Sequence, residues 1–315
     1  MKIKMFNVRF YVLAFALTAS SFTALKGQKF KTLHDTEGLA LLEGKDSILF
    51  YQRKSKSMDG KYERANYIHP LYGLNGEVLS EDFPDDHLHH RGIFWAWHQN
   101  RIDGKQVADG WAIENMTWDV KGLRAVTSKK KADIHAEVLW KTTADENKGA
   151  VDLVLEKTTV TVYPTEKHSR TIDFSISLTA LVEGLEIGGS EDVKGYSGFS
   201  LRVKLPEDIN FTSQGEVLQP KTEAVEGGPW LDMTGTFSPG LPSSGIAVFC
   251  HPQYPKKKQP WILRSARSMQ NPAFPHTELA KVGTKDPLVL KYRVVIHDNT
   301  VGSEALEEMY QTFIK

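Results

Sequence analysis

Four histidines, four carboxylates, one arginine and two tryptophans fall within residues 81–98. Only 11 histidines occur in the whole chain, so this stretch is unusually rich in them. Histidine transfers protons near neutral pH and binds transition metals, and indole rings stack on the faces of sugars. This concentration exceeds what a surface loop requires, and we predict that residues 81–98 form the active or binding site.

Two kinds of chemistry are open to these histidines. If the segment is extended, His87 and His89 project to one side, and His90 projects to the other side with Asp86. A His-x-His pair near a carboxylate can bind a divalent transition metal, with His87 and His89 as ligands. Without a metal, histidine and arginine can donate and accept protons at a sugar hydroxyl or ring oxygen. We favour metal-free chemistry with no cofactor over a divalent metal, and both over histidines that only bond to turn carbonyls.

Within the stretch, His90 and Arg91 are predicted to be catalytic. His90 adjoins Arg91-Gly92, where the backbone can bend and present the imidazole to a ligand as general acid or ring-oxygen partner. The guanidinium of Arg91 would bind developing negative charge or a substrate carboxylate. Three further histidines are predicted to bind the substrate: His87, His89 and His98. Of these, His98 would orient substrate hydroxyls together with Lys194.

Trp95 and Trp97 are predicted to bind substrate as well. In an extended segment the two indoles share one face, where they could form a platform for a pyranose ring. Paired tryptophans are more often buried in a core, which is the alternative.

Two sites outside this stretch carry further candidates. Gly195 and Gly198 allow the backbone to bend beside Lys194 and Tyr196. Lys194 is predicted to be catalytic, and Tyr196 is predicted to bind substrate. A plain turn with a solvated lysine is equally consistent. His251 follows the apolar run 245–250. A neutral imidazole there could accept a proton at neutral pH, so His251 is the predicted catalytic base.

The elements that must position these groups are strands. Residues 171–178 alternate without a fault, so that the side chains of 172, 174, 176 and 178 share one face. Alternating or β-branched runs recur at 38–42, 47–51, 133–140, 151–163, 199–205, 245–250 and 288–296. One helix is predicted near the C-terminus, capped by Ser303, with an apolar face of Leu306, Met309, Tyr310 and Phe313. The fold class is therefore all-β, a large antiparallel β-sandwich with a short C-terminal helix.

Residues 1–28 are predicted to be a cleaved signal peptide, because Lys2, Lys4 and Arg9 precede a short apolar run and small residues. Residues 29–315 would then form a single β-sandwich domain, secreted or periplasmic. The single cysteine, Cys250, leaves no pair for an intramolecular disulfide. Lys plus Arg and Asp plus Glu both total 39, which argues against a nucleic-acid partner, and no later apolar stretch reaches membrane-spanning length.

Several motifs resemble a known family. The segments 67–73, 81–92, 194–199 and 271–274 together resemble the DUF6807 family, whose members are often labelled methane oxygenase PmoA, over nearly the whole mature chain. More distantly, residues 87–92 are similar to the His-Gly-Gly loop of galactose-mutarotase-like proteins, whose histidine acts on the sugar ring oxygen. Residues 247–293 are similar to the mutarotase C-terminal region, where a glutamate acts as base near the position of His251. The resemblance implies a mutarotase-like β-supersandwich.

We therefore expect an exported, carbohydrate-active enzyme that uses acid/base chemistry of the epimerase, lyase or hydrolase type. Its partner would be a carbohydrate or sugar-derived small molecule, with no nucleic acid and no membrane after signal cleavage. A methane monooxygenase is not expected, because such a subunit is an integral membrane protein. A non-catalytic carbohydrate-binding protein and a metal-dependent enzyme using His87 and His89 are the alternatives.

Overall fold

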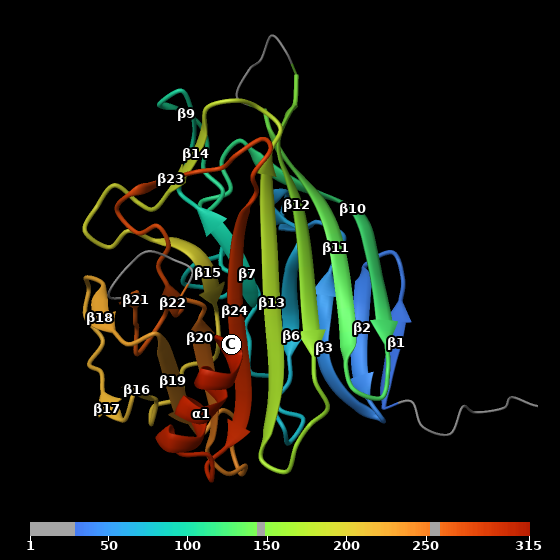
Figure 1. Ribbon diagram of the computed structural model, residues 1–315, viewed down its shortest axis with the longest axis vertical. Helices are drawn as coiled ribbons and strands as arrows, with labels where there is room; N and C mark the ends of the chain where they lie inside the picture. The colour runs from blue at the N-terminus through green and yellow to red at the C-terminus, as the bar shows by residue number, and fades with distance from the viewer. Residues whose placement is uncertain (1–28, 144–148, 253–258) are drawn as a thin grey trace, which may run out of the picture.

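The computed structural model describes residues 29–143, 149–252 and 259–315, so the predicted signal peptide, residues 1–28, lies outside the described residues. Two large antiparallel sheets face one another (Figure 1). The first has six strands in the order β1-β2-β3-β6-β7-β15. Its strands are β1 (Phe30–His34), β2 (Gly38–Glu43), β3 (Asp46–Gln52), β6 (Tyr67–Leu71), β7 (Ile93–Trp97) and β15 (Ser197–Leu201).

The second sheet has nine strands in the order β10-β11-β12-β13-β24-β20-β19-β16-β17. Its long strands occupy the front of Figure 1. The strands are β10 (Met116–Thr127), β11 (Ala132–Thr142), β12 (Val151–Val162), β13 (Ser169–Ala180), β16 (Asn210–Ser213), β17 (Glu216–Val217), β19 (Trp230–Gly235), β20 (Ser244–Cys250) and β24 (Leu288–Asp298).

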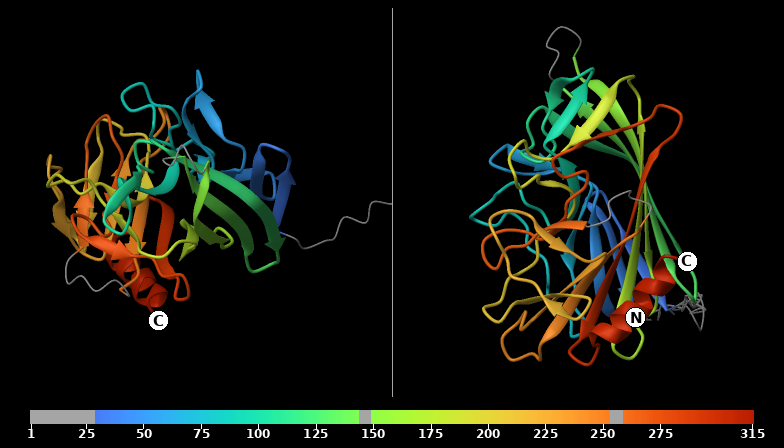
Figure 2. Two further views of the ribbon diagram at one scale, coloured as in Figure 1. Left: turned by 90° about the horizontal axis from the view of Figure 1, so that it is seen from above. Right: turned by 60° about the vertical axis from the view of Figure 1, so that its left-hand side comes forward.

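Three small antiparallel sheets complete the strand inventory of the described residues. They hold β4 (Lys56–Met58) and β5 (Lys61–Arg64); β8 (Gln99–Ile102), β9 (Lys105–Ala108), β14 (Leu185–Gly188) and β23 (Leu279–Lys281); and β18 (Val225–Gly227), β21 (Gln259–Ile262) and β22 (Asn271–Pro272). Figure 2 shows these short strands gathered beside the ends of the large sheets.

The main core lies between the two large sheets, and the alternation of strand side chains fills it. In β13, Ile172, Phe174, Ile176 and Leu178 are at most 1% exposed, as their period-two spacing predicts. The predicted all-β sandwich is confirmed.

The same alternation decides the direction of the tryptophans in β7. Trp95 and Trp97 do share a face, but it is the core face, where they are 1% and 0% exposed. Their indole N–H groups donate to the Glu156 carboxylate and to the Phe274 carbonyl. The predicted sugar platform of Trp95 and Trp97 is therefore wrong, because burial against the nine-stranded sheet leaves no ring face for a ligand.

Helix α1 (Ser303–Phe313) covers the outside of the nine-stranded sheet near β19 and β20 (Figure 1). Its predicted apolar face is confirmed, since Leu306 and Tyr310 are buried in a cluster with Trp230 and Phe249. The predicted cap is wrong: Gly302 is the N-cap, and Ser303 is the first helical residue. Over the described ranges, no helix has the length and apolarity needed to cross a membrane.

Candidate functional site

The candidate site lies on the outer face of β7, which we define as the face turned away from the nine-stranded sheet. Phe94 and Ala96 point to this face and pack in a small apolar cluster with Trp111 and Met269. His98 follows β7 directly and continues the alternation. Loops 81–91 and 190–196 supply the other polar side chains.

The histidine loop is wound in turns and is not extended. The N–H of His87 donates to the Pro84 carbonyl (3.0 Å), and the N–H of His90 donates to the His87 carbonyl (2.9 Å). The His87 and His90 rings therefore stack, with centroids 4.7 Å apart, and His89 meets His90 edge-on at 4.5 Å. The expectation that His90 faces away from His87 and His89 is wrong, because successive turns bring all three rings together.

His90 is held as a neutral imidazole. It is 3% exposed, and Nη1 of Arg202 lies 3.4 Å from its Nδ1. A guanidinium has no acceptor, so Nδ1 accepts and the ring proton belongs on Nε2. Burial, followed by the charges of its neighbours, lowers the pKa of His90 well below its usual value, and burial lowers the pKa of His89 to about 4. Both rings are uncharged at neutral pH.

Arg202 ties this loop to the end of β15. Its Nε donates to Oε2 of Glu81 (2.7 Å), and its Nη2 donates to Oδ1 of Asp86 (2.8 Å). Burial alone would raise the pKa of the Asp86 carboxyl, but the bonds from Arg202 and His87 lower it. The arginine thus fixes the first and middle parts of the loop while it contacts His90.

Arg91 does not reach a ligand, which corrects its predicted catalytic role. Its side chain is fully buried, and it donates to the carbonyls of Tyr62, Leu88 and His90. Its Nε lies 3.4 Å from a carboxylate oxygen of Asp82. With the guanidinium occupied in this way, Arg91 holds the loop in shape and has no donor directed at the site.

His98 is oriented by a carboxylate. Its Nδ1 lies 2.8 Å from Oδ2 of Asp109, while Oδ1 of Asp109 accepts the N–H groups of Trp111 and Ala112, both at 2.8 Å. Arg64 stabilises this turn, because its Nη2 donates to the Gly110 carbonyl at 2.5 Å. An Nδ1–H bond to a fixed carboxylate leaves Nε2 of His98 as the proton acceptor.

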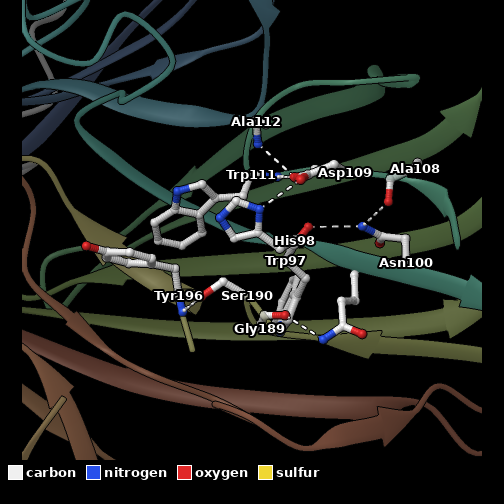
Figure 3. Close-up of polar contacts among 12 residues, drawn as sticks. Trp97, His98, Asn100, Ala108, Asp109, Trp111, Ala112, Gly189, Ser190 and Tyr196 are labelled. Atoms are coloured by element: carbon white, nitrogen blue, oxygen red, sulfur yellow. Dashed lines mark hydrogen bonds and ion pairs between the residues drawn. The ribbon is translucent and has the colours of Figure 1, made fainter. Parts of the chain in front are cut away.

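Trp111 joins the histidine loop to His98 and Tyr196. Its ring centroid lies 6.3 Å from that of His90, 5.5 Å from that of His98 and 5.5 Å from that of Tyr196. Figure 3 shows the His98 ring stacked on the indole and Tyr196 beside it, with the tyrosine hydroxyl on the side away from His98. His98 and Tyr196 thus flank one indole, with ring centroids 6.5 Å apart.

A family model described as "Family of unknown function (DUF6807)" matches residues 39–311. The chain belongs to the DUF6807 family. That description assigns no activity, and no curated protein matches the sequence.

Among solved structures, this DUF6807 chain is similar to the crystal structure of GH36 α-galactosidase AgaB from Geobacillus stearothermophilus. The TM-score is 0.32 and the sequence identity is 10%. The match covers 86% of this chain and 40% of the galactosidase, so the DUF6807 chain spans less than half of that enzyme.

The DUF6807 fold separates His251 from the other predicted site residues. His251 lies at the end of β20, beside Phe313 of α1, and lines a cavity of about 580 Å³ together with Cys250 and Tyr310. None of the other predicted site residues lines that cavity. The prediction that His251 acts as base in one site with His90 is therefore wrong. Strand β20 belongs to the nine-stranded sheet, and His251 at its end lies beside α1.

Lys194 lies at the margin of the site in this DUF6807 protein. Its Nζ is 3.5 Å from a carboxylate oxygen of Asp192 and 5.8 Å from the ring centroid of Tyr196. Its side chain is 34% exposed and lines a pocket next to Tyr196. Lys194 is therefore placed to contact a ligand and not to contact His98.

A preformed metal centre is not found in the parts of the chain that the structure describes. No group of three or more His, Cys, Asp or Glu is arranged there to hold an ion. The His87 and His89 rings meet edge-on with centroids 5.7 Å apart.

Four residues of the site were not among the sequence candidates: Asp109, Trp111, Arg202 and Arg264. Asp109 and Trp111 flank a single glycine, which is a signal for a tight turn that presents both side chains. Arg202 and Arg264 act through contacts more than 60 residues away along the chain, at His90 and Tyr196. No local pattern identifies such long-range partners.

Proposed function

We propose that this DUF6807 protein binds a sugar or sugar derivative on the outer face of β7 and acts on it by acid/base chemistry. The observation that carries the proposal is the Asp109–His98 pair stacked on Trp111, with Tyr196 on the same indole. An oriented imidazole, a phenol and the half-buried aromatic ring of Tyr196 are groups that suit sugar chemistry at a hydroxyl or an acidic C–H.

In this proposal Nε2 of His98 accepts a proton from the sugar, and Asp109 stabilises the imidazolium that forms. The hydroxyl of Tyr196 is the candidate proton donor. It already accepts a hydrogen bond from Nη2 of Arg264 (2.9 Å), which leaves its own O–H to donate to a ligand. His89 and His90, both neutral, would bind hydroxyls at the margin of the site.

The test is a survey of activity with the mature protein. Mono- and disaccharides and their keto derivatives are incubated with it and followed by NMR for anomeric exchange, epimerisation or cleavage. Turnover that is lost in His98→Ala and kept in His251→Ala is the expected result. Binding shifts at the site without turnover would favour the non-catalytic carbohydrate-binding alternative, and turnover kept in His98→Ala would overturn the proposed base.

A further inference from the structure

We infer that the ligand of this site is a sugar carrying an anionic group, bound in a basic pocket next to Tyr196; this inference rests on the proposed function. The pocket has a volume of about 500 Å³ and lies between the loops that contain Lys194, Thr222 and Arg264. Among the described residues its charged lining side chains are Lys194, Lys221 and Arg264, and none of the described residues that line it is acidic.

Arg264 is positioned as an uncompensated cation. Its Nη1 donates to the carbonyls of Lys221 (2.5 Å) and Leu263 (2.8 Å). Its Nη2 donates to the Thr222 carbonyl (2.7 Å) and the Tyr196 hydroxyl (2.9 Å). All four acceptors are neutral, and within the described residues no carboxylate forms an ion pair with this guanidinium. The side chain is therefore rigid. Its Nη hydrogens are already used, so it would attract an incoming anion through its uncompensated charge, and the lysines would supply the direct hydrogen bonds.

The two lysines add to the same field. Lys194 is partly compensated by Asp192 at 3.5 Å, but that carboxylate is half exposed and also accepts hydrogen bonds from Ser190 and from the Lys194 backbone. Lys221 is exposed and shows no carboxylate partner in the described parts of the chain. Three cations and one shared carboxylate leave the pocket net positive, which favours an anionic ligand group.

Tyr196 connects the pocket to the proposed catalytic groups. Its ring lies against Trp111, while its hydroxyl is bound to Arg264. A sugar ring packed against the half-buried ring of Tyr196 would therefore direct a substituent toward Arg264 and Lys194, which line the same pocket. A carboxylate at the exocyclic carbon, as in a uronate, or a sulfate ester at that position has this arrangement of ring and charge.

The experiment measures binding by calorimetry and NMR titration with matched pairs of probes. These are D-galacturonate and D-galactose, D-glucuronate and D-glucose, with D-galactose 6-sulfate to distinguish a sulfate ester from a carboxylate. The proteins are wild type, the Lys194→Gln/Lys221→Gln double variant and Arg264→Gln. Lys129→Gln, which removes an exposed lysine of the β10–β11 turn, is the matched control. The double variant matters because Arg264→Gln also removes the bonds that hold residues 221 and 222.

At least one acidic sugar is expected to bind roughly tenfold or more tightly than its neutral parent, the scale of a charged hydrogen bond. The preference should shrink in both variants and at high salt, and persist in Lys129→Gln. Equal binding of acidic and neutral sugars, or a preference unchanged in the double variant, would overturn the inference and leave the proposed function standing. If none of the five sugars binds, both the inference and the proposed function fail.

Discussion

Nη1 of Arg202 lies 3.4 Å from Nδ1 of His90, which joins the end of β15 to the centre of the histidine loop. Because the arginine can only donate, this contact requires an unprotonated Nδ1. The same guanidinium binds Glu81 and Asp86, so the loop conformation and the protonation state of His90 depend on one side chain.

The first prediction concerns the protonation of the loop histidines. His90 should be neutral with its proton on Nε2 at neutral pH and should stay so below the ordinary histidine range, and His89 should titrate with a midpoint of about 4. Ring ¹⁵N and ¹³C chemical shifts measured by NMR against pH would report both. A His89 midpoint near the ordinary value of about 6.5 would contradict the assigned burial of this ring.

These lowered pKa values also predict how stability depends on pH. The unfolded chain binds protons at His89 below about pH 6.5, whereas the folded chain binds one there only near pH 4. The free energy of unfolding should therefore fall as the pH is lowered from about 6.5 toward 4. His89→Gln should weaken this acid loss in urea titrations, and His34→Gln, which changes an exposed histidine of β1, should not.

The second prediction concerns His297, whose pKa is shifted upward and not downward. This buried ring has an acceptor at each nitrogen: Oδ1 of Asp232 at 2.9 Å and the Asp298 carbonyl at 2.8 Å. Burial alone would lower the pKa of His297, but these acceptors outweigh it and raise the pKa. The stabilisation is complete below the unfolded value of about 6.5 and is lost as the pH rises through the folded value.

His297→Gln should therefore destabilise the fold more at pH 6 than at pH 9, because only the protonated ring satisfies both acceptors. The expected loss at pH 6 is about 3 kcal/mol, the scale of a broken buried ion pair. His168→Gln is the matched control, since His168 pairs with Asp298 at 2.8 Å at a half-exposed position. Its effect should stay below about 1 kcal/mol. Equal losses from His297→Gln at the two pH values would refute the imidazolium assignment.

The third prediction concerns the buried carboxylate of Glu156. Its Oε2 accepts from the indoles of Trp95 (3.0 Å) and Trp140 (2.8 Å) and from Asn66 (2.8 Å), and its Oε1 accepts from Thr158 (2.6 Å). An amide can replace this pattern, with its oxygen facing the three donors and its NH₂ group donating to the threonine hydroxyl. Glu156→Gln should therefore change the free energy of unfolding by less than about 1.5 kcal/mol.

Glu156→Leu should cost about 3 kcal/mol or more, because it removes the acceptor of all four buried donors. Denaturant titrations of both variants measure the difference. If the leucine variant is as stable as the glutamine variant, these hydrogen bonds do not hold β7 against the nine-stranded sheet.

Strand alternation made the sandwich predictable, as β13 shows, and it also placed Trp95 and Trp97 on one face. It could not say which face is the core, because Phe94, Ala96 and His98 form an equally regular second face. The extended conformation predicted for the histidine loop is wrong for another reason. The loop turns at Pro84 and again at His87, so the two-residue alternation of an extended chain does not apply there. Arg202 and Arg264 reach the site only through tertiary contacts, so the sequence offers no local signal for them.

The last prediction tests the proposed proton acceptor through Asp109→Asn. Oδ1 of Asp109 accepts two backbone N–H groups, so the amide oxygen of an asparagine should take that position and turn its NH₂ group toward His98. The NH₂ group would then donate to Nδ1 of His98, which forces the ring proton onto Nε2 and blocks proton acceptance there. Turnover of the substrate found in the activity survey should fall by about 100-fold or more, while the thermal midpoint and KM change little. His98 ring ¹⁵N shifts should show the exchanged tautomer, a signature that a purely structural role would not produce.

Asp192→Asn, at an exposed carboxylate that contacts Lys194 and not His98, is the control. An Asp109→Asn enzyme with full turnover and an unchanged tautomer would remove His98 from the reaction.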